Sequence, residues 1–166
     1  MTTTASYRII NLLGVPHFKS ALEEWFISAW LPWYGPGGQG DAGSDIAEYR
    51  ERDLLPICLL AIDQNEHVIG TASLKEDSVG SSPGTGPWLA AVLVKENLRG
   101  QGIGTALVIA IEHEAVRLGF RSIWSSTDTA GHILERQGWN KEGGAMSLRG
   151  TLDIYRRDLL SNGSST

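Results

Sequence analysis

The chain has 166 residues, of which 42% are hydrophobic and 20% are charged. This composition excludes an intrinsically disordered protein, and the length fits one globular domain, which we expect at residues 1–160. The net charge is −5, and the sequence contains no cluster of Lys or Arg. Both features argue against nucleic acid as a partner. No window holds the roughly 20 apolar residues of a membrane span, and no basic segment precedes an apolar stretch at the N-terminus, so we expect a cytoplasmic protein without membrane contact.

The first third of the chain predicts a strand, two helices and a loop between the helices. Residues 7–12 have the pattern of a strand, and residues 16–30 place apolar side chains at helical spacing. The Gly- and Pro-rich residues 32–40 predict a surface loop, because such a sequence does not continue a helix. A short helix is expected over residues 44–52, with Ser44 as its N-cap.

The middle of the chain predicts an antiparallel hairpin followed by a buried strand. Residues 57–62 and 67–74 are β-like runs separated by a short polar turn. Cys58, the one cysteine of the chain, lies in the first run, which predicts a buried structural thiol and excludes an intrachain disulfide. After the polar loop 78–87, the apolar residues 88–94 predict a central buried strand.

The last part of the chain alternates helices and strands. Residues 102–118 carry one apolar stripe, which predicts a helix that packs on the sheet and ends at Gly119. The elements that follow are a strand, a helix and two strands, at residues 121–125, 130–137, 139–148 and 152–157. This order implies one parallel strand pair among antiparallel ones, and therefore an α+β fold with a mixed sheet. The small polar segment 161–166 is expected to lie outside the fold.

The clearest chemical signal is the glycine-rich turn Arg99-Gly100-Gln101-Gly102-Ile103-Gly104, between the strand 88–94 and the helix 102–118. Its glycines let a ligand approach the backbone without meeting a Cβ. The first amides of a helix are unpaired and carry about half a positive charge, so a diphosphate fits there, with Arg99 as a cation beside it. The pattern predicts a phosphate-binding turn.

Two other phosphate-binding turns fit this sequence less well. A P-loop requires Gly-x-x-x-x-Gly-Lys-Ser/Thr, and neither the spacing nor the lysine is present. A dinucleotide fingerprint requires Gly-x-Gly-x-x-Gly near the chain start, whereas Thr105 stands in place of a glycine here and the strand lies mid-chain. The pattern that remains is Arg-x-x-Gly-x-Gly after a buried strand.

With this pattern the chain resembles the GNAT superfamily of acetyl-CoA-dependent N-acetyltransferases. Residues 92–107 are similar to the family's strand, turn and pyrophosphate loop, and residues 130–139 are similar to its A-x-x-F-Y-E-K-x-G-F/W signature. Specific motifs are confined to residues 88–139, and the first third matches only in outline. The resemblance implies a mixed, mostly antiparallel sheet of about six to seven strands flanked by about four helices.

The resemblance also implies acetyl-CoA as the cofactor, without a metal, and a set of residues that bind it. These are Val92, Leu93, Val94, Arg99, Gly100, Gln101, Gly102, Ile103, Gly104, Thr105, Ala130 and Leu134. In relatives the strand that here ends at Val94 separates from its neighbour, and a bulge frees backbone amides for the thioester and the pantetheine. An amide near Val92 would stabilise the developing oxyanion.

Direct attack of a neutral amine on the thioester, the mechanism that the resemblance implies, needs a base for the ammonium and an acid for the thiolate. The tyrosine that serves as the acid in many relatives is replaced by Leu134, so His132 and water remain as alternatives, and His132 also fits a surface or capping role. Glu76 and Asp77, after the second hairpin strand, are candidate bases, with a solvated strand end as the alternative interpretation.

The implied acceptor is a primary amine of a small molecule or a peptide. Trp33, Tyr34 and Trp88 are candidate substrate-binding residues, because relatives bind the acceptor on this side and aromatic rings attract cationic amines. Two other functions stay open: a non-catalytic acyl-CoA-binding module or sensor, suggested by the missing tyrosine, and a domain whose glycine turn binds nothing. Exposed sheet edges near the C-terminus favour a homodimer.

Overall fold

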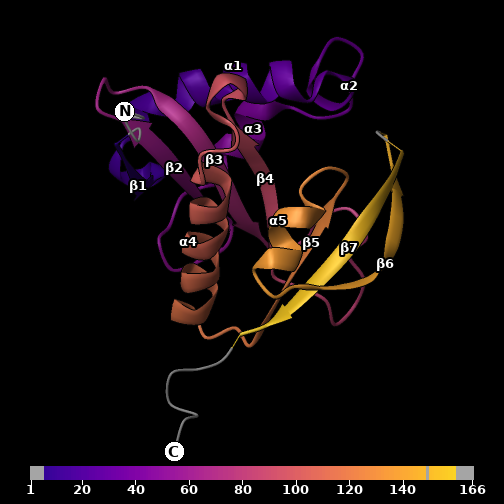
Figure 1. Cartoon of the computed structure of the whole chain (residues 1–166). Helices are drawn as coiled ribbons and strands as arrows, with labels where there is room; N and C mark the ends of the chain where they lie inside the picture. Colours follow the sequence, from indigo (N-terminus) through magenta and orange to yellow (C-terminus); the bar gives the residue numbers. More distant parts are fainter. Residues whose placement is uncertain (1–5, 149, 160–166) are drawn as a thin grey trace, which may run out of the picture.

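The computed structural model describes residues 6–148 and 150–159, in which seven strands form one sheet with helices on both faces (Figure 1). The strands are β1 Tyr7–Asn11, β2 Ile57–Asp63, β3 Val68–Lys75, β4 Trp88–Val94, β5 Ser122–Thr127, β6 Asn140–Ser147 and β7 Gly150–Asp158. The α-helices are α1 Lys19–Ala29, α2 Leu31–Tyr34, α3 Ala42–Ala47, α4 Ile103–Arg117 and α5 Gly131–Arg136. Short 3-10 helices are η1 Leu12–Gly14, η2 Pro16–Phe18 and η3 Glu96–Leu98.

The sheet order is β1-β2-β3-β4-β5-β7-β6, and its neighbouring strands are antiparallel except for β4 and β5. These two run parallel because α4 carries the chain back across the sheet between them. The arrangement confirms the predicted mixed, mostly antiparallel sheet. The described residues form five α-helices where about four were expected, since the short α2 and α3 both count.

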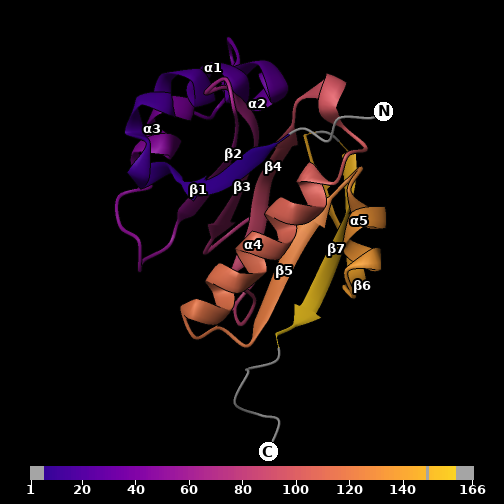
Figure 2. The same cartoon turned by 60° about the vertical axis from the view of Figure 1, so that its left-hand side comes forward.

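Two hydrophobic clusters fill the two sides of the sheet. Helices α4 and α5 cover one face and α1 to α3 cover the other (Figure 2). Alternate side chains of β2 point to opposite faces of the sheet. Leu59 belongs to the same cluster as Leu107 of α4, and Leu60 belongs to the same cluster as Phe26 of α1. Both β2 and β3 are buried on both faces: β2 is a nearly continuous apolar run, whereas β3 also buries the polar residues Thr71 and Ser73. The predicted hairpin is confirmed.

Two predictions for the first third of the chain are wrong in detail. Residues 31–34 form α2, with Pro32 in its first turn, so the loop begins later than expected. The N-cap of α3 is Asp41, whose carboxylate accepts the amide of Ser44 at 3.0 Å. Ser44 therefore lies inside the first turn of a helix that is shorter than predicted.

Cys58 is buried, as the sequence predicts, and lies 3.4 Å from the hydroxyl of Thr71. Burial raises the pKa of its thiol to about 11, so the group is a neutral part of the core. Within residues 6–148 and 150–159, none of the helices has both the length and the apolar character needed to cross a membrane. The prediction for residues 161–166 concerns residues outside the described part of the chain.

Candidate active site

Strands β4 and β5 pair over a short distance and then separate. Trp88 is in register with Trp124 and Leu89 with Ser125, and no further pair joins the two strands in the described structure. Residues 90–94 are therefore half-buried, in contrast to the fully buried strand that the sequence predicts. The backbone groups of these residues on the β5 side have no ladder partner in β5, as expected from the resemblance.

A β-bulge lies in the same part of β4. Thr71 of β3 is opposite Leu93 and Ser73 is opposite Ala90, so β4 has one residue more than β3 in this interval. Ala91 has a φ of 54°, a left-handed conformation that residues with a Cβ seldom adopt. The bulge therefore re-aims the backbone immediately before Val92.

The glycine-rich turn follows β4 directly. Gly100 and Gly102 have φ values of 81° and 87°, which favour glycine, and a Cβ on either would meet nothing within 4 Å. Gly102 is the N-cap of α4 and has no side chain to accept from the first helical amides, which point out along the helix axis. The start of α4 thus combines unpaired donors with open space, an arrangement that can bind an anion such as a diphosphate.

Arg99 supplies a positive charge at this turn. Its side chain is exposed, and its Nε donates to the backbone carbonyl of Val94 at 3.2 Å. The amide of Lys95 donates to the carbonyl of Ile69 at 2.9 Å, which continues the β3–β4 ladder into the turn. Gln101 is exposed and Thr105 is half-buried on the first turn of α4. The side chain of Ile103 between them is 1% exposed and belongs to the core, so only its backbone is available for the predicted contact with a cofactor.

Helix α5 carries the second motif and packs beside the start of α4. Ile133 lies 3.5 Å from the place that a Cβ on Gly104 would occupy. Leu134 is 1% exposed and belongs to the core, so its placement disagrees with the predicted contact to a cofactor. The rotation of the helix turns Leu134 to the sheet and leaves His132 exposed. At the N-cap of α5, the amide of Ala130 donates to the hydroxyl of Thr127 at 2.9 Å.

The two candidate bases lie at the other end of β4. Glu76 and Asp77 are exposed and directly follow Lys75, which is opposite Trp88 in the antiparallel register. Val92 lies near the other end of that register, about four residues or roughly 13 Å along the strand. The structure therefore does not bring these carboxylates to the bulge.

The three candidate aromatic residues have different surroundings. Trp33 is 41% exposed on α2, whereas the hydroxyl of half-buried Tyr34 donates to Asp45 at 2.5 Å. Burial and this bond raise the pKa of Tyr34, so it stays a neutral donor. Trp88 is 0% exposed and packs beside Trp124, which disagrees with its predicted contact to a substrate. Its buried Nε1 has no hydrogen-bond partner in the described residues.

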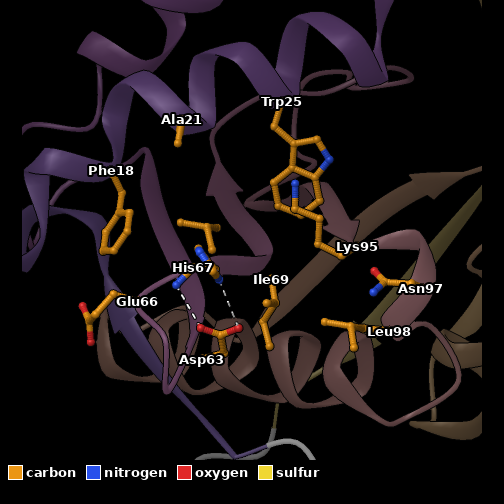
Figure 3. Close-up of a pocket in the computed structure, with 11 residues that line it drawn as sticks. Phe18, Ala21, Trp25, Asp63, Glu66, His67, Ile69, Lys95, Asn97 and Leu98 are labelled. Atoms are coloured by element: carbon orange, nitrogen blue, oxygen red, sulfur yellow. Dashed lines mark hydrogen bonds and ion pairs between the residues drawn. The ribbon is translucent and has the colours of Figure 1, made fainter.

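A cavity of about 460 Å³ lies between α1, the β2–β3 turn and η3, next to the glycine-rich turn (Figure 3). At one end of it, Nζ of Lys95 stands 4.3 Å from the centre of the Trp25 ring. Sequence reasoning did not find this contact, because the two residues belong to separate motifs. A lysine directly after a strand that leads into a glycine-rich turn is the local signal that could have pointed to it.

The model of the acetyltransferase (GNAT) family matches residues 20–139. No curated protein matches the chain in sequence. An aminoglycoside 6′-N-acetyltransferase complexed with coenzyme A has a TM-score of 0.73 at 18% identity, over 93% of this chain and 98% of that chain. The aminoglycoside 6′-N-acetyltransferase from Enterococcus faecium gives 0.71 at 17%, over 93% and 98%. An acetyltransferase of the GNAT family from Staphylococcus aureus Mu50 gives 0.71 at 17%, over 93% and 100%, so these structures share one fold with the chain.

Proposed function

Since the chain belongs to the acetyltransferase (GNAT) family and is an acyltransferase, we propose that it transfers the acetyl group of acetyl-CoA to a primary amine of a small molecule or a peptide. The observation that carries this proposal is the open glycine-rich turn at the start of α4, with Arg99 beside it. The similar structures add support, because one is complexed with coenzyme A and two act on aminoglycosides.

The residues present fit the cofactor. The amides at the start of α4 and the charge of Arg99 suit its diphosphate, and the unpaired edge of residues 92–94 suits the amide groups of its pantetheine arm. When bound, acetyl-CoA supplies an acyl group activated as a thioester. In our proposal the amide of Val92, next to the bulge, donates to the thioester oxygen and stabilises the charge that develops there.

Proton transfer is assigned to water in this proposal. Leu134 has no proton to give and is buried, and His132 is exposed on α5. Glu76 and Asp77 lie at the far end of β4. The protein's contribution is therefore to orient the thioester and the amine and to polarise the carbonyl, while solvent takes the proton of the ammonium and protonates the thiolate.

Thiol release from acetyl-CoA, measured with a panel of primary amines, tests this function. We expect release that depends on an amine, together with a rise in melting temperature when coenzyme A is added. A rise without amine-dependent release would instead support an acyl-CoA-binding module, the alternative that Leu134 in the tyrosine position favours. No rise at all would contradict binding at the turn.

Replacing Arg99 with Ala is expected to weaken coenzyme A binding by about 1.5–3 kcal/mol, roughly tenfold to a hundredfold in Kd, because a charge-assisted bond to the diphosphate is lost. Titration calorimetry of the two proteins measures the change. Arg121→Ala, which removes the same charge from an exposed position just before β5, is the matched control and should bind like the parent. Equal affinities for all three proteins would contradict the assignment.

A further inference from the structure

The glycine-rich turn does not rest directly on the helical layer behind it. Asn97 and Leu98 of η3 line the cavity of about 460 Å³, and α1 forms the facing wall with Phe18, which precedes the helix, Ala21 and Trp25 (Figure 3). Lys95, which leads from β4 into η3, also lines this cavity. A contact from Lys95 across the cavity therefore adds a link to α1 to the backbone contacts that hold the turn on the sheet.

Lys95 makes such a contact at the base of the turn. Its amide donates to Ile69 and its carbonyl accepts from Leu98, both at 2.9 Å, so its backbone is fixed to the sheet and to η3. Its Nζ lies 4.3 Å from the ring centre of Trp25 on α1, well within the range of a cation–π contact. One residue thus connects the sheet, the turn and α1.

The charge of Lys95 is directed to the ring although two carboxylates line the same cavity. Asp63 lies 3.7 Å from His67 in the same β2–β3 turn, and Glu66 pairs with Arg8 of β1 at 3.0 Å, so both acids have other partners. None of the ion pairs recorded in the described residues includes Lys95. Trp25 is therefore the partner that the fold provides for this cation.

Helix α1 also reaches the proposed acceptor side. Phe26, next to Trp25 in sequence, packs its ring against Trp30 at 5.2 Å and stacks with Tyr34 of α2 at 6.2 Å between ring centres. Trp33 follows on the same short helix. A displacement of α1 at Trp25 would therefore affect both the glycine-rich turn and the aromatic residues of α2.

We propose that Lys95 and Trp25 are a positioning pair that holds the glycine-rich turn in the shape that accepts the diphosphate. The inference rests on the proposed function, since it assigns a role towards coenzyme A. The pair acts through the turn: Nζ is occupied by the indole ring, and Arg99, four residues later, supplies the charge that faces the ligand.

A double-mutant cycle tests the pair with coenzyme A as the titrant in calorimetry. Because Lys95 is exposed, Lys95→Met and Trp25→Leu should each weaken binding by about threefold to fivefold, the range that the loss of an exposed cation–π contact produces. The double variant should lose no more affinity for coenzyme A than the single variant with the larger loss, because both changes break the same contact. Lys95→Arg and Trp25→Phe, which keep a cation and a ring, should bind within about twofold of the parent.

Two controls separate positioning from charge and from general destabilisation. Lys141→Met removes one lysine charge from β6, where Lys141 pairs with Asp153, and should not change the Kd. The melting temperature of each variant is measured beside its Kd. If the pair only stabilised the fold, Lys95→Met and Trp25→Leu would lower the melting temperature, and Lys95→Arg would not restore the affinity for coenzyme A. Parental affinity in Trp25→Leu, or single losses that multiply in the double variant, would overturn the pair. Failure of the parent itself to bind coenzyme A would overturn the proposed function as well.

Discussion

Replacing Gly102 with Val is expected to remove measurable coenzyme A binding, a loss of more than about 100-fold in affinity or about 2.7 kcal/mol. Gly102 stands at the N-cap of α4 with a φ of 87°, and the space around its missing Cβ is open. A β-branched side chain there would fill the space over the first amides of α4. It would also strain the backbone that aims those amides, by about 1–3 kcal/mol.

The other end of the same helix offers a matched control. Gly119 follows α4 with a φ of 90°, and a Cβ there would also meet nothing within 4 Å. Gly119→Val therefore introduces the same strain without touching the turn. Calorimetric titration and melting curves of both variants should show similar losses of stability but loss of binding in Gly102→Val alone. Binding by Gly102→Val within about threefold of the parent, under 1 kcal/mol, would contradict a diphosphate site at this helix start.

Replacing Glu112 with Ala is expected to lower the free energy of unfolding by about 3 kcal/mol. Glu112 is 7% exposed on α4, and its carboxylate accepts Nη1 of Arg157 at 2.6 Å and Nε1 of Trp139 at 3.2 Å. Removing it leaves a guanidinium and an indole N–H without their acceptor inside the packed region. The effect stays below that of a fully buried pair, because a third of the Arg157 side chain reaches solvent.

Urea unfolding of Glu112→Ala, compared with Glu114→Ala, measures this contribution. Glu114 lies on the same helix and pairs with Arg117 at 2.7 Å on the more exposed side, so its loss should cost about 0.5 kcal/mol. Glu112→Gln keeps an acceptor for one of the two donors, which bond to different carboxylate oxygens, and its loss should fall between the two. Equal losses for the two alanine variants would show that Glu112 does not join α4 to β7 and to Trp139 before β6.

Local sequence patterns predicted the parts of this fold that depend on local physics. The strands β2 and β3 follow from two β-like runs separated by a short polar turn, and α4 follows from one apolar stripe bounded by Gly102 and Gly119. The glycine-rich turn before α4 belongs to the same class of prediction. Left-handed glycines and the unpaired amides of a helix start are properties of a few consecutive residues, so they can be predicted before the fold is known.

Tertiary structure decided the features that depend on which surfaces meet. The rotation of α5 against the sheet buried Leu134, and the short pairing of β4 with β5 enclosed Trp88 while it opened the edge at Val92. The contact of Lys95 with Trp25 joins residues far apart in the chain. A sequence period states which residues share a face, but it does not state what that face packs against, because the partner is set by strand order and crossover geometry.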